Sequence, residues 1–172
     1  MSEKIDLLFE RRSIRAYSEG PVSKEQIEML LKAGMAAATA GNKRPWHITV
    51  VEDPDLLQKL ADTGKKACGM VPVVLVVSGD KSRFFDGERA AVQAYWQQDC
   101  GAATQNILLA ATALGLGSLW MGVYPGEEMV KKVTDILELP DNLVPFALIS
   151  IGHKGEEKEA RTQYEEEQVT WK

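Results

Sequence analysis

The sequence predicts a mixed α and β fold, and three observations lead to this expectation. Ser23 and Gln26 form a capping box at the start of an amphipathic helical pattern. The run 72–78 is continuously apolar, which is typical of a strand that is covered on both faces. No repeat or linker divides the 172 residues. We therefore expect residues 1–172 to form a single domain.

The first half of the chain is expected to alternate between helices and strands. Ile5, Leu8 and Phe9 recur at helical spacing, and Asp53 followed by Pro54 is typical of a helix start. The expected elements are a helix over 5–10, a helix from Ser23 to about Ala38, a strand over 48–51, a helix from Pro54 to about Lys65, a loop over 66–70 and a strand over 72–78.

The second half is dominated by a long, alanine-rich segment over 87–114 that is apolar around most of its helical circumference. Such a helix is buried on more than one side, and one of these sides is plausibly covered by a second copy of the chain. The charged tail 154–172 nearly lacks aliphatic residues, so it must lie over something else. The other expected elements are a break over 115–118, a short strand or extended loop over 119–123, a helix over 126–137 and a strand over 144–152.

Composition excludes several classes of function. The formal net charge is −5 and the pI is about 5.2, which argues against non-specific nucleic-acid binding. The sequence shows neither a secretory signal nor an apolar run that is long enough to cross a membrane, so a cytoplasmic protein is expected. Two cysteines and two histidines give poor support for a disulfide framework, a metal site or a catalytic dyad.

The pentad, residues 11–15, stands out against this acidic background because it holds three arginines. In an extended chain Arg11, Ser13 and Arg15 would share one face, with Arg12 and Ile14 on the other. Guanidinium groups bind phosphate through directed hydrogen bonds, and the Ser13 hydroxyl and nearby backbone N–H groups could complete an anion site. The alternative is a solvated basic turn that follows the first helix.

The order of these elements resembles the FMN-dependent nitroreductase family, in its short, single-domain branch. This resemblance implies a central, mostly antiparallel sheet flanked by helices, and a homodimer with an extended C-terminal tail. The chain departs from the family pattern at Ala38-Thr39, where Pro-Ser is usual, at Arg44 in place of Gln, and at Gln163 in place of a second basic residue. The matching segments are the pentad, Asn42-x-x-Pro45-Trp46, the run 99–122, and Ile151-Gly152-His153 with Arg161 beyond it.

The resemblance also implies a site for FMN. Arg15 would place its cation at the N1–O2 edge of the ring, where it would favour the reduced, negatively charged form. Trp46 has an alternative role as core packing. The other implied contacts are Arg11, Arg12, Ser13 and Arg161 with the phosphate and ribityl chain, Trp120, Met121 and Gly122 along the N5 side, Asn42 and Trp46 at the pyrimidine end, and Ala38, Thr39 and Ala40 from the partner subunit.

The implied activity is a two-step reduction in which NAD(P)H reduces FMN and leaves, and a nitroaromatic, a quinone or a similar small-molecule acceptor is then reduced. The absence of a candidate nucleophile fits this chemistry. Two alternatives stay open: narrower flavin chemistry on the same fold, such as reductive dehalogenation or an oxygen-dependent step, and a flavin-binding protein without turnover. Arg44 hints at NADPH, and the sequence does not identify the acceptor.

Overall fold

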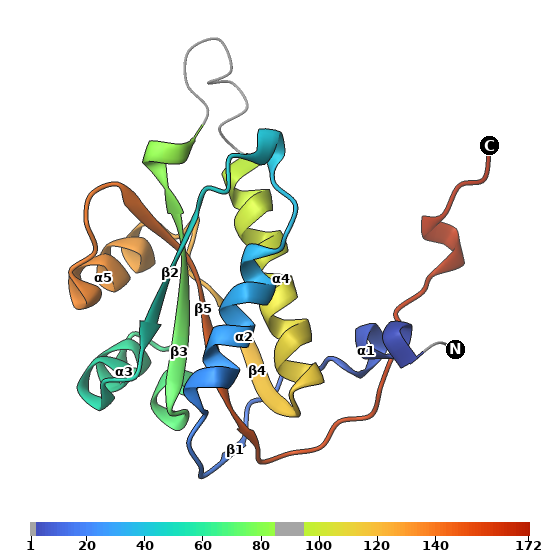
Figure 1. Ribbon diagram of the computed structural model, residues 1–172, viewed down its shortest axis with the longest axis horizontal. Coiled ribbons are helices and arrows are strands. Elements are labelled where there is room, and N and C mark those ends of the chain that lie inside the picture. Colours follow the sequence, from blue (N-terminus) through green and yellow to red (C-terminus); the bar gives the residue numbers. More distant parts are fainter. Residues whose placement is uncertain (1–2, 85–94) are drawn as a thin grey trace.

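The computed structural model describes residues 3–84 and 95–172 and is built around one five-stranded sheet (Figure 1). Each pairing between named strands in the described residues is antiparallel. The long strand β5 is central, with β3 and then β2 on one edge and β4 on the other. The strands are β1 (Tyr17–Ser18), β2 (Trp46–Val51), β3 (Val73–Asp80), β4 (Leu116–Gly122) and β5 (Leu143–Lys154).

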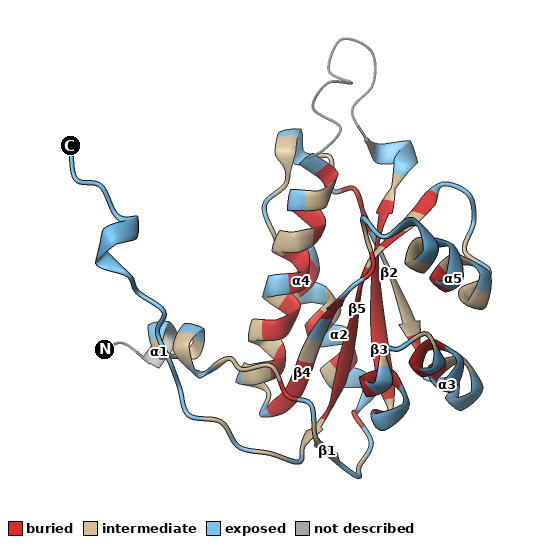
Figure 2. Cartoon of the chain, turned by 180° about the vertical axis from the view of Figure 1, so that it is seen from behind, coloured by how far each residue is buried: buried red, intermediate tan, exposed pale blue. Residues whose placement is uncertain are grey.

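Helices cover both faces of the sheet, which confirms the predicted α+β architecture (Figures 1 and 2). Val73, Leu75 and Val77 of β3 enter the core under α2 and α4, whereas Val74 and Val76 enter the core under α3 and α5. This alternation explains why the strand is continuously apolar. The helices are α1 (Glu3–Glu10), α2 (Lys24–Met35), α3 (Pro54–Asp62), α4 (Tyr95–Ala113) and α5 (Glu127–Leu137).

α4 is the buried helix that its composition predicts. Ala103, Ile107 and Ala111 are fully buried, and a methyl group added at Gly34 of α2 would lie 2.8 Å from Ile107 Cγ1. Small residues thus allow α2 and α4 to approach closely. The predicted start of this helix, residues 87–94, lies outside the described residues. In the part of the chain that the structure describes, no helix has the length and apolar character that a membrane crossing requires.

Several predicted boundaries are wrong. α2 ends at Met35 rather than Ala38, because the Ala36 N–H is shared between the carbonyls of Lys32 and Ala33 and the Ala37 N–H bonds three residues back, to Gly34. The predicted loop 66–70 forms a 3₁₀ helix. β2 begins at Trp46, two residues earlier than expected.

Of the predicted break over residues 115–118, only the first residue lies outside regular structure. Gly115 adopts a positive φ of 72°, which ends α4, and β4 begins at the next residue. Gly117 and Ser118 are buried strand residues that pair with Gly152 and Ile151 of β5. The sequence prediction placed Gly117 in the break after the helix. In the structure, Gly117 makes room for a neighbouring side chain, as described below.

The C-terminal residues leave the body of the structure. After β5 the chain passes α1 and extends away from the sheet (Figure 1). All residues from Arg161 to Lys172 are exposed, including Tyr164 and Trp171, which are 67% and 87% exposed (Figure 2). The only regular structure in this stretch is the short 3₁₀ helix Glu166–Gln168.

Candidate functional site

The pentad is extended and lies along the outer edge of β4. Ser13 forms an isolated parallel bridge with Ser118, and the Ile14 N–H donates to the Ser118 carbonyl at 3.0 Å. Ile14 is only 3% exposed, and its Cγ2 lies 3.0 Å from the position that a Cβ of Gly117 would take. Glycine at this position therefore lets the pentad dock against the sheet.

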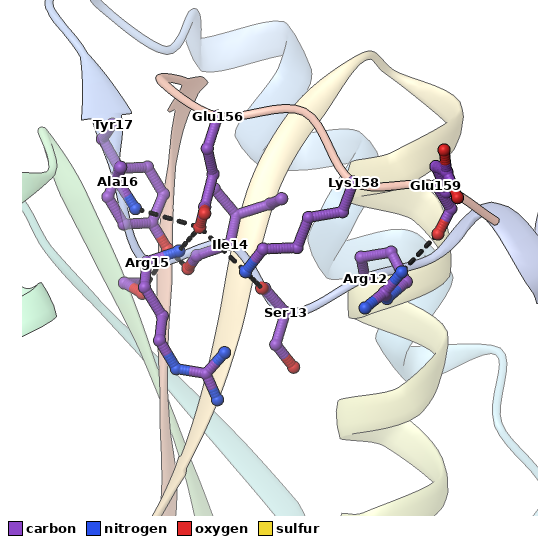
Figure 3. A network of polar contacts seen from close by, with 10 residues as sticks. Arg12, Ser13, Ile14, Arg15, Ala16, Tyr17, Glu156, Lys158 and Glu159 are labelled. Carbon is purple, nitrogen blue, oxygen red and sulfur yellow. Dashed lines mark hydrogen bonds and ion pairs between the residues drawn. The ribbon is translucent and has the colours of Figure 1, made fainter. Parts of the chain in front are cut away.

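The polar side chains of Ser13 and Arg15 in the pentad remain available to a ligand. Ser13 is half-buried and Arg15 is exposed. Figure 3 shows the Ser13 hydroxyl and the Arg15 guanidinium pointing to the same side, away from the side chains of Glu156 and Lys158. This arrangement agrees with the alternation that an extended chain predicts.

Residues 155–161, which we call the strap, run antiparallel over the pentad. β1 and β5 pair Tyr17 with Lys154, and the strap keeps this register beyond both strands. Figure 3 shows two of the contacts, from Lys158 Nζ to the Ser13 carbonyl at 2.7 Å and from Arg12 Nη1 to the Glu159 carbonyl. The others run from Gly155 N–H to the Ala16 carbonyl at 2.9 Å and from Arg161 N–H to the Phe9 carbonyl at 3.1 Å. The charged tail thus covers the pentad before it leaves the body.

One strap side chain corrects the predicted anion site. Glu156 Oε1 accepts hydrogen bonds from the N–H groups of Arg15 at 2.6 Å and Ala16 at 3.2 Å. The Ile14 N–H is also used, by the Ser118 carbonyl. These three backbone donors are therefore already occupied. The sequence prediction had supposed that nearby backbone N–H groups could bind the anion. Binding at the pentad has to depend chiefly on side chains.

Arg11, Arg12 and Arg161 form a cluster of positive charge beside the strap. Burial lowers the pKa of Arg11, and repulsion from Arg161 and Arg12 lowers it further. In the described part of the chain, none of these three guanidinium groups is ion-paired with a carboxylate. Uncompensated, mutually repelling cations at a half-buried position favour a dianionic ligand such as a phosphate monoester. The phosphate group of FMN fits this cluster.

The predicted flavin segment of β4 presents two different faces. Trp120 is 36% exposed, stacks at a tilt on Phe146 with ring centroids 5.8 Å apart, and lies near Gly101 of α4. Met121 is buried in the core under α3 and α5. Gly122 is exposed, and an added Cβ would meet nothing within 4 Å. The segment therefore offers an open backbone position at Gly122 and a partly exposed aromatic ring.

The segment over 38–42 lies at the other end of α4. Ala38 and Asn42 are exposed, and Thr39 and Ala40 are half-buried. The backbone turns sharply here, because Gly41 and Asn42 have positive φ values of 56° and 53°. Trp46 follows in β2 and is 8% exposed within the core under α2 and α4, so the structure supports its alternative role in packing.

One chain does not bring all the predicted site residues together. The Ala40 N–H bonds to Asp99 near the start of α4, whereas Arg12 and Ile14 line a small cavity with Thr112 near its end. At 1.5 Å per residue these two points are about 20 Å apart along the helix. The segment 38–42 therefore lies far from the arginine cluster of its own chain.

Sequence reasoning missed the roles of Asp99, Glu156 and Lys158. Asp99 carried a signal, because an acidic residue in an otherwise apolar helix needs a partner. It is 6% exposed, and its Oδ1 accepts the Ala40 N–H at 3.0 Å. Glu156 and Lys158 carried no such signal, because charged residues are common throughout the tail.

Asp99 leads to a prediction on pH. Burial raises the pKa of this carboxyl, against the opposing effect of the Ala40 N–H bond. A raised pKa in the folded state means that ionisation destabilises the fold as pH rises above the unfolded value, which is about 3.9. Asp99→Asn keeps an oxygen that can accept from Ala40 and removes the charge. We expect the Tm to rise at pH 7, by about 2–4 °C for each kcal/mol gained.

Calorimetry of the parent and Asp99→Asn between pH 4 and pH 8 checks this expectation. The difference in Tm should shrink as the pH falls. A variant that is less stable than the parent at pH 7 would show that the ionised carboxylate is favoured in the folded protein.

The fold and the site define an α+β domain that carries a cluster of arginines on the edge of an antiparallel sheet. The sequence model of the Nitroreductase family matches residues 8–68 and 63–153. The chain therefore belongs to the nitroreductase family. Together, the two matched segments cover both the pentad and the whole of β4.

Individual relatives agree with this assignment. A protein of Archaeoglobus fulgidus provisionally named NADH dehydrogenase/NAD(P)H nitroreductase is 41% identical over 92% of this chain and 90% of its own length. A structure from Bacteroides thetaiotaomicron with the same provisional name has a TM-score of 0.91, at 34% identity, and covers 99% of this chain and 98% of its own. An FMN-dependent nitroreductase from Clostridium difficile has a TM-score of 0.84, at 30% identity, with 97% and 98% coverage.

Proposed function

We propose that this chain uses NAD(P)H and FMN to reduce an electron-poor small molecule, such as a nitroaromatic or a quinone, in two successive half-reactions at one site. Family membership makes it an NAD(P)H-dependent FMN oxidoreductase. The observation that carries the proposal is the uncompensated cluster of Arg11, Arg12 and Arg161, placed beside the exposed edge of β4. FMN, when bound, supplies the hydride chemistry.

The chain's own groups then have distinct tasks. Arg11, Arg12 and Arg161 hold the phosphate, and the Ser13 hydroxyl donates to the phosphate or the ribityl chain. The Arg15 cation stabilises negative charge at the N1–O2 edge of the ring. The remaining proposed contacts are Trp120, Met121 and Gly122 beside N5, and Asn42 near the pyrimidine end, whereas Trp46 packs in the core.

We also propose a homodimer with each cofactor at the subunit interface, where Ala38, Thr39 and Ala40 belong to the partner's site. The long separation between segment 38–42 and the arginine cluster within one chain supports this arrangement. Exposed apolar side chains on α1 and the tail also support the homodimer, because such exposed apolar groups mark protein–protein interfaces. They are Ile5, Leu8, Tyr164, Val169 and Trp171.

The test is to reconstitute the protein with FMN under anaerobic conditions and to add NADH or NADPH separately. We expect the flavin absorbance near 450 nm to bleach with at least one donor and to return when a quinone is added. Failure to bleach with either donor would contradict the reductase function and would favour a flavin-binding protein without turnover.

Gly122 offers a further prediction. An added methyl group would meet no protein atom within 4 Å, so Gly122→Ala should fold normally. If the ring edge packs against this backbone, the same methyl group should weaken FMN binding by about 10-fold, as overpacking costs about 1–3 kcal/mol. Isothermal titration with FMN measures the effect. An unchanged affinity would move the cofactor away from the end of β4.

A further inference from the structure

Glu156 and Lys158 differ from the other charged residues of the tail because their side chains are largely covered. They are 29% and 23% exposed, and their charged atoms lie 3.0 Å apart. Each also bonds to the backbone of the pentad. Glu156 Oε1 accepts from the Arg15 and Ala16 N–H groups, and Lys158 Nζ donates to the Ser13 carbonyl (Figure 3). The pair thus acts on the backbone of the residues that present the cofactor contacts.

The other backbone contacts of the pentad show what Glu156 and Lys158 contribute. The backbone of Ile14 is already fixed, because its N–H bonds to Ser118 and its carbonyl accepts from the Tyr17 hydroxyl at 2.8 Å. Ser13 and Arg15 stand on either side of this anchored residue. In the described part of the chain, Lys158 fixes the carbonyl of Ser13 and Glu156 fixes the N–H of Arg15. The directions of the Ser13 hydroxyl and the Arg15 guanidinium therefore depend on the strap.

Charge pairing suits this role. Hydrogen bonds from Arg15 and Lys158 lower the pKa of Glu156, so the carboxylate is ionised at neutral pH. A carboxylate alone beside the phosphate site would repel the phosphate. An ammonium alone would compete with the arginine cluster for the phosphate. Together the two groups bind the pentad backbone while adding almost no net charge to the anion site.

We infer that Glu156 and Lys158 are positioning residues that orient Ser13 and Arg15 toward the cofactor from the side opposite to it. This inference rests on the proposed function, because it takes FMN as the ligand of the pentad. Neither residue touches the cofactor in this arrangement. The side chains of Glu156 and Lys158 lie on one side of the pentad, and the Ser13 hydroxyl and the Arg15 guanidinium point to the other (Figure 3).

The experiment compares Glu156→Gln with Glu156→Ala. Glutamine keeps an oxygen that can accept both N–H groups, whereas alanine leaves them unpaired. We expect Glu156→Ala to raise the Kd for FMN by about 10-fold or more, the scale of a lost hydrogen bond to a charged group, and Glu156→Gln to raise it by less than about 3-fold. Quenching of FMN fluorescence by the apoprotein gives both values.

The midpoint potential of the bound flavin is a second readout, which a merely structural role would not move in this way. Glu156→Ala removes a negative charge, which by itself would raise the potential, but it also frees the Arg15 N–H, so loss of the Arg15 orientation should lower the potential. Lys158→Met should lower it as well, whereas Glu156→Gln keeps the acceptor oxygen and should not lower it. A merely structural role, without an effect on the direction of Arg15, would leave Glu156→Ala with an unchanged or raised potential. The matched controls are Asp135→Gln and Lys131→Met, which remove the partners of a 2.7 Å ion pair on α5.

The outcomes separate the two claims. If the parent protein itself does not bind FMN, the proposed function fails. If the parent binds FMN but Glu156→Ala has the same Kd and potential, the inference is overturned. Equal losses in Glu156→Gln and Glu156→Ala would also overturn it, because the acceptor oxygen would then be irrelevant. A lower potential in Glu156→Ala and Lys158→Met, with no fall in Glu156→Gln and no shift in the controls, supports it.

Discussion

Replacing both Arg11 and Arg12 by glutamine is expected to raise the Kd for FMN by at least about 100-fold, because each lost charge-assisted contact costs about 1.5–3 kcal/mol. The two guanidinium groups stand beside Arg161 with no carboxylate partner among the described residues. A dianionic phosphate would satisfy them together. Titration calorimetry with FMN provides the measurement.

The same double variant also distinguishes the loss of phosphate contacts from a loss of the folded structure. Burial, and then repulsion from Arg161 and Arg12, lowers the pKa of Arg11, so the charged form of Arg11 is disfavoured in the chain without a ligand. We therefore expect the apoprotein of the double variant to melt no lower than the parent apoprotein. Lys131→Gln on α5 is the matched control, since it removes a cation on the other face of the sheet. A Kd within about 3-fold of the parent would place the phosphate elsewhere.

If the chain forms the proposed homodimer, removal of residues 162–172 is expected to convert it to a monomer at micromolar concentration. This segment carries Tyr164 and Trp171, which are 67% and 87% exposed in the single chain. Buried aromatic anchors at interfaces each contribute about 2 kcal/mol or more, so losing two should weaken association by about 1,000-fold. Sedimentation velocity of the parent and the shortened chain, across a range of concentrations, measures this change.

The shortened chain should keep its fold, because the strap ends at Arg161 and the sheet lies upstream of it. Far-ultraviolet circular dichroism provides this control. The proposed interface would be contradicted if the shortened chain sedimented as a dimer with an unchanged dissociation constant. A flavin-loaded monomer of the parent would contradict the shared site itself.

The elements of the fold were largely predictable because their hydrophobic patterns are strong. The capping box at Ser23 and the continuous run of β3 both appear in the structure as expected. Prediction failed where small residues carry little pattern. The alanine-rich end of α2 gave no signal for its stop at Met35, and Gly117 was read as a turn although it makes room for Ile14.

The candidate site was predictable only in part. Three arginines in five residues are a local signal, and the structure does place the pentad along a sheet edge. The strap is a long-range feature, because its bonds join residues about 140 or more positions apart, as Glu156 and Arg15 show. Local periodicity cannot reveal such a pairing. The contribution of the partner subunit stays a prediction for the same reason.

The most direct test of the central claim, that the pentad holds the phosphate of FMN, compares FMN with riboflavin on the unmodified apoprotein. The two ligands share the ring and the ribityl chain and differ only in the phosphate. Because the arginine cluster acts on that group alone, we predict that FMN binds at least about 100-fold more tightly than riboflavin. Equal affinities for the two flavins, measured by fluorescence quenching in the same buffer, would contradict the account.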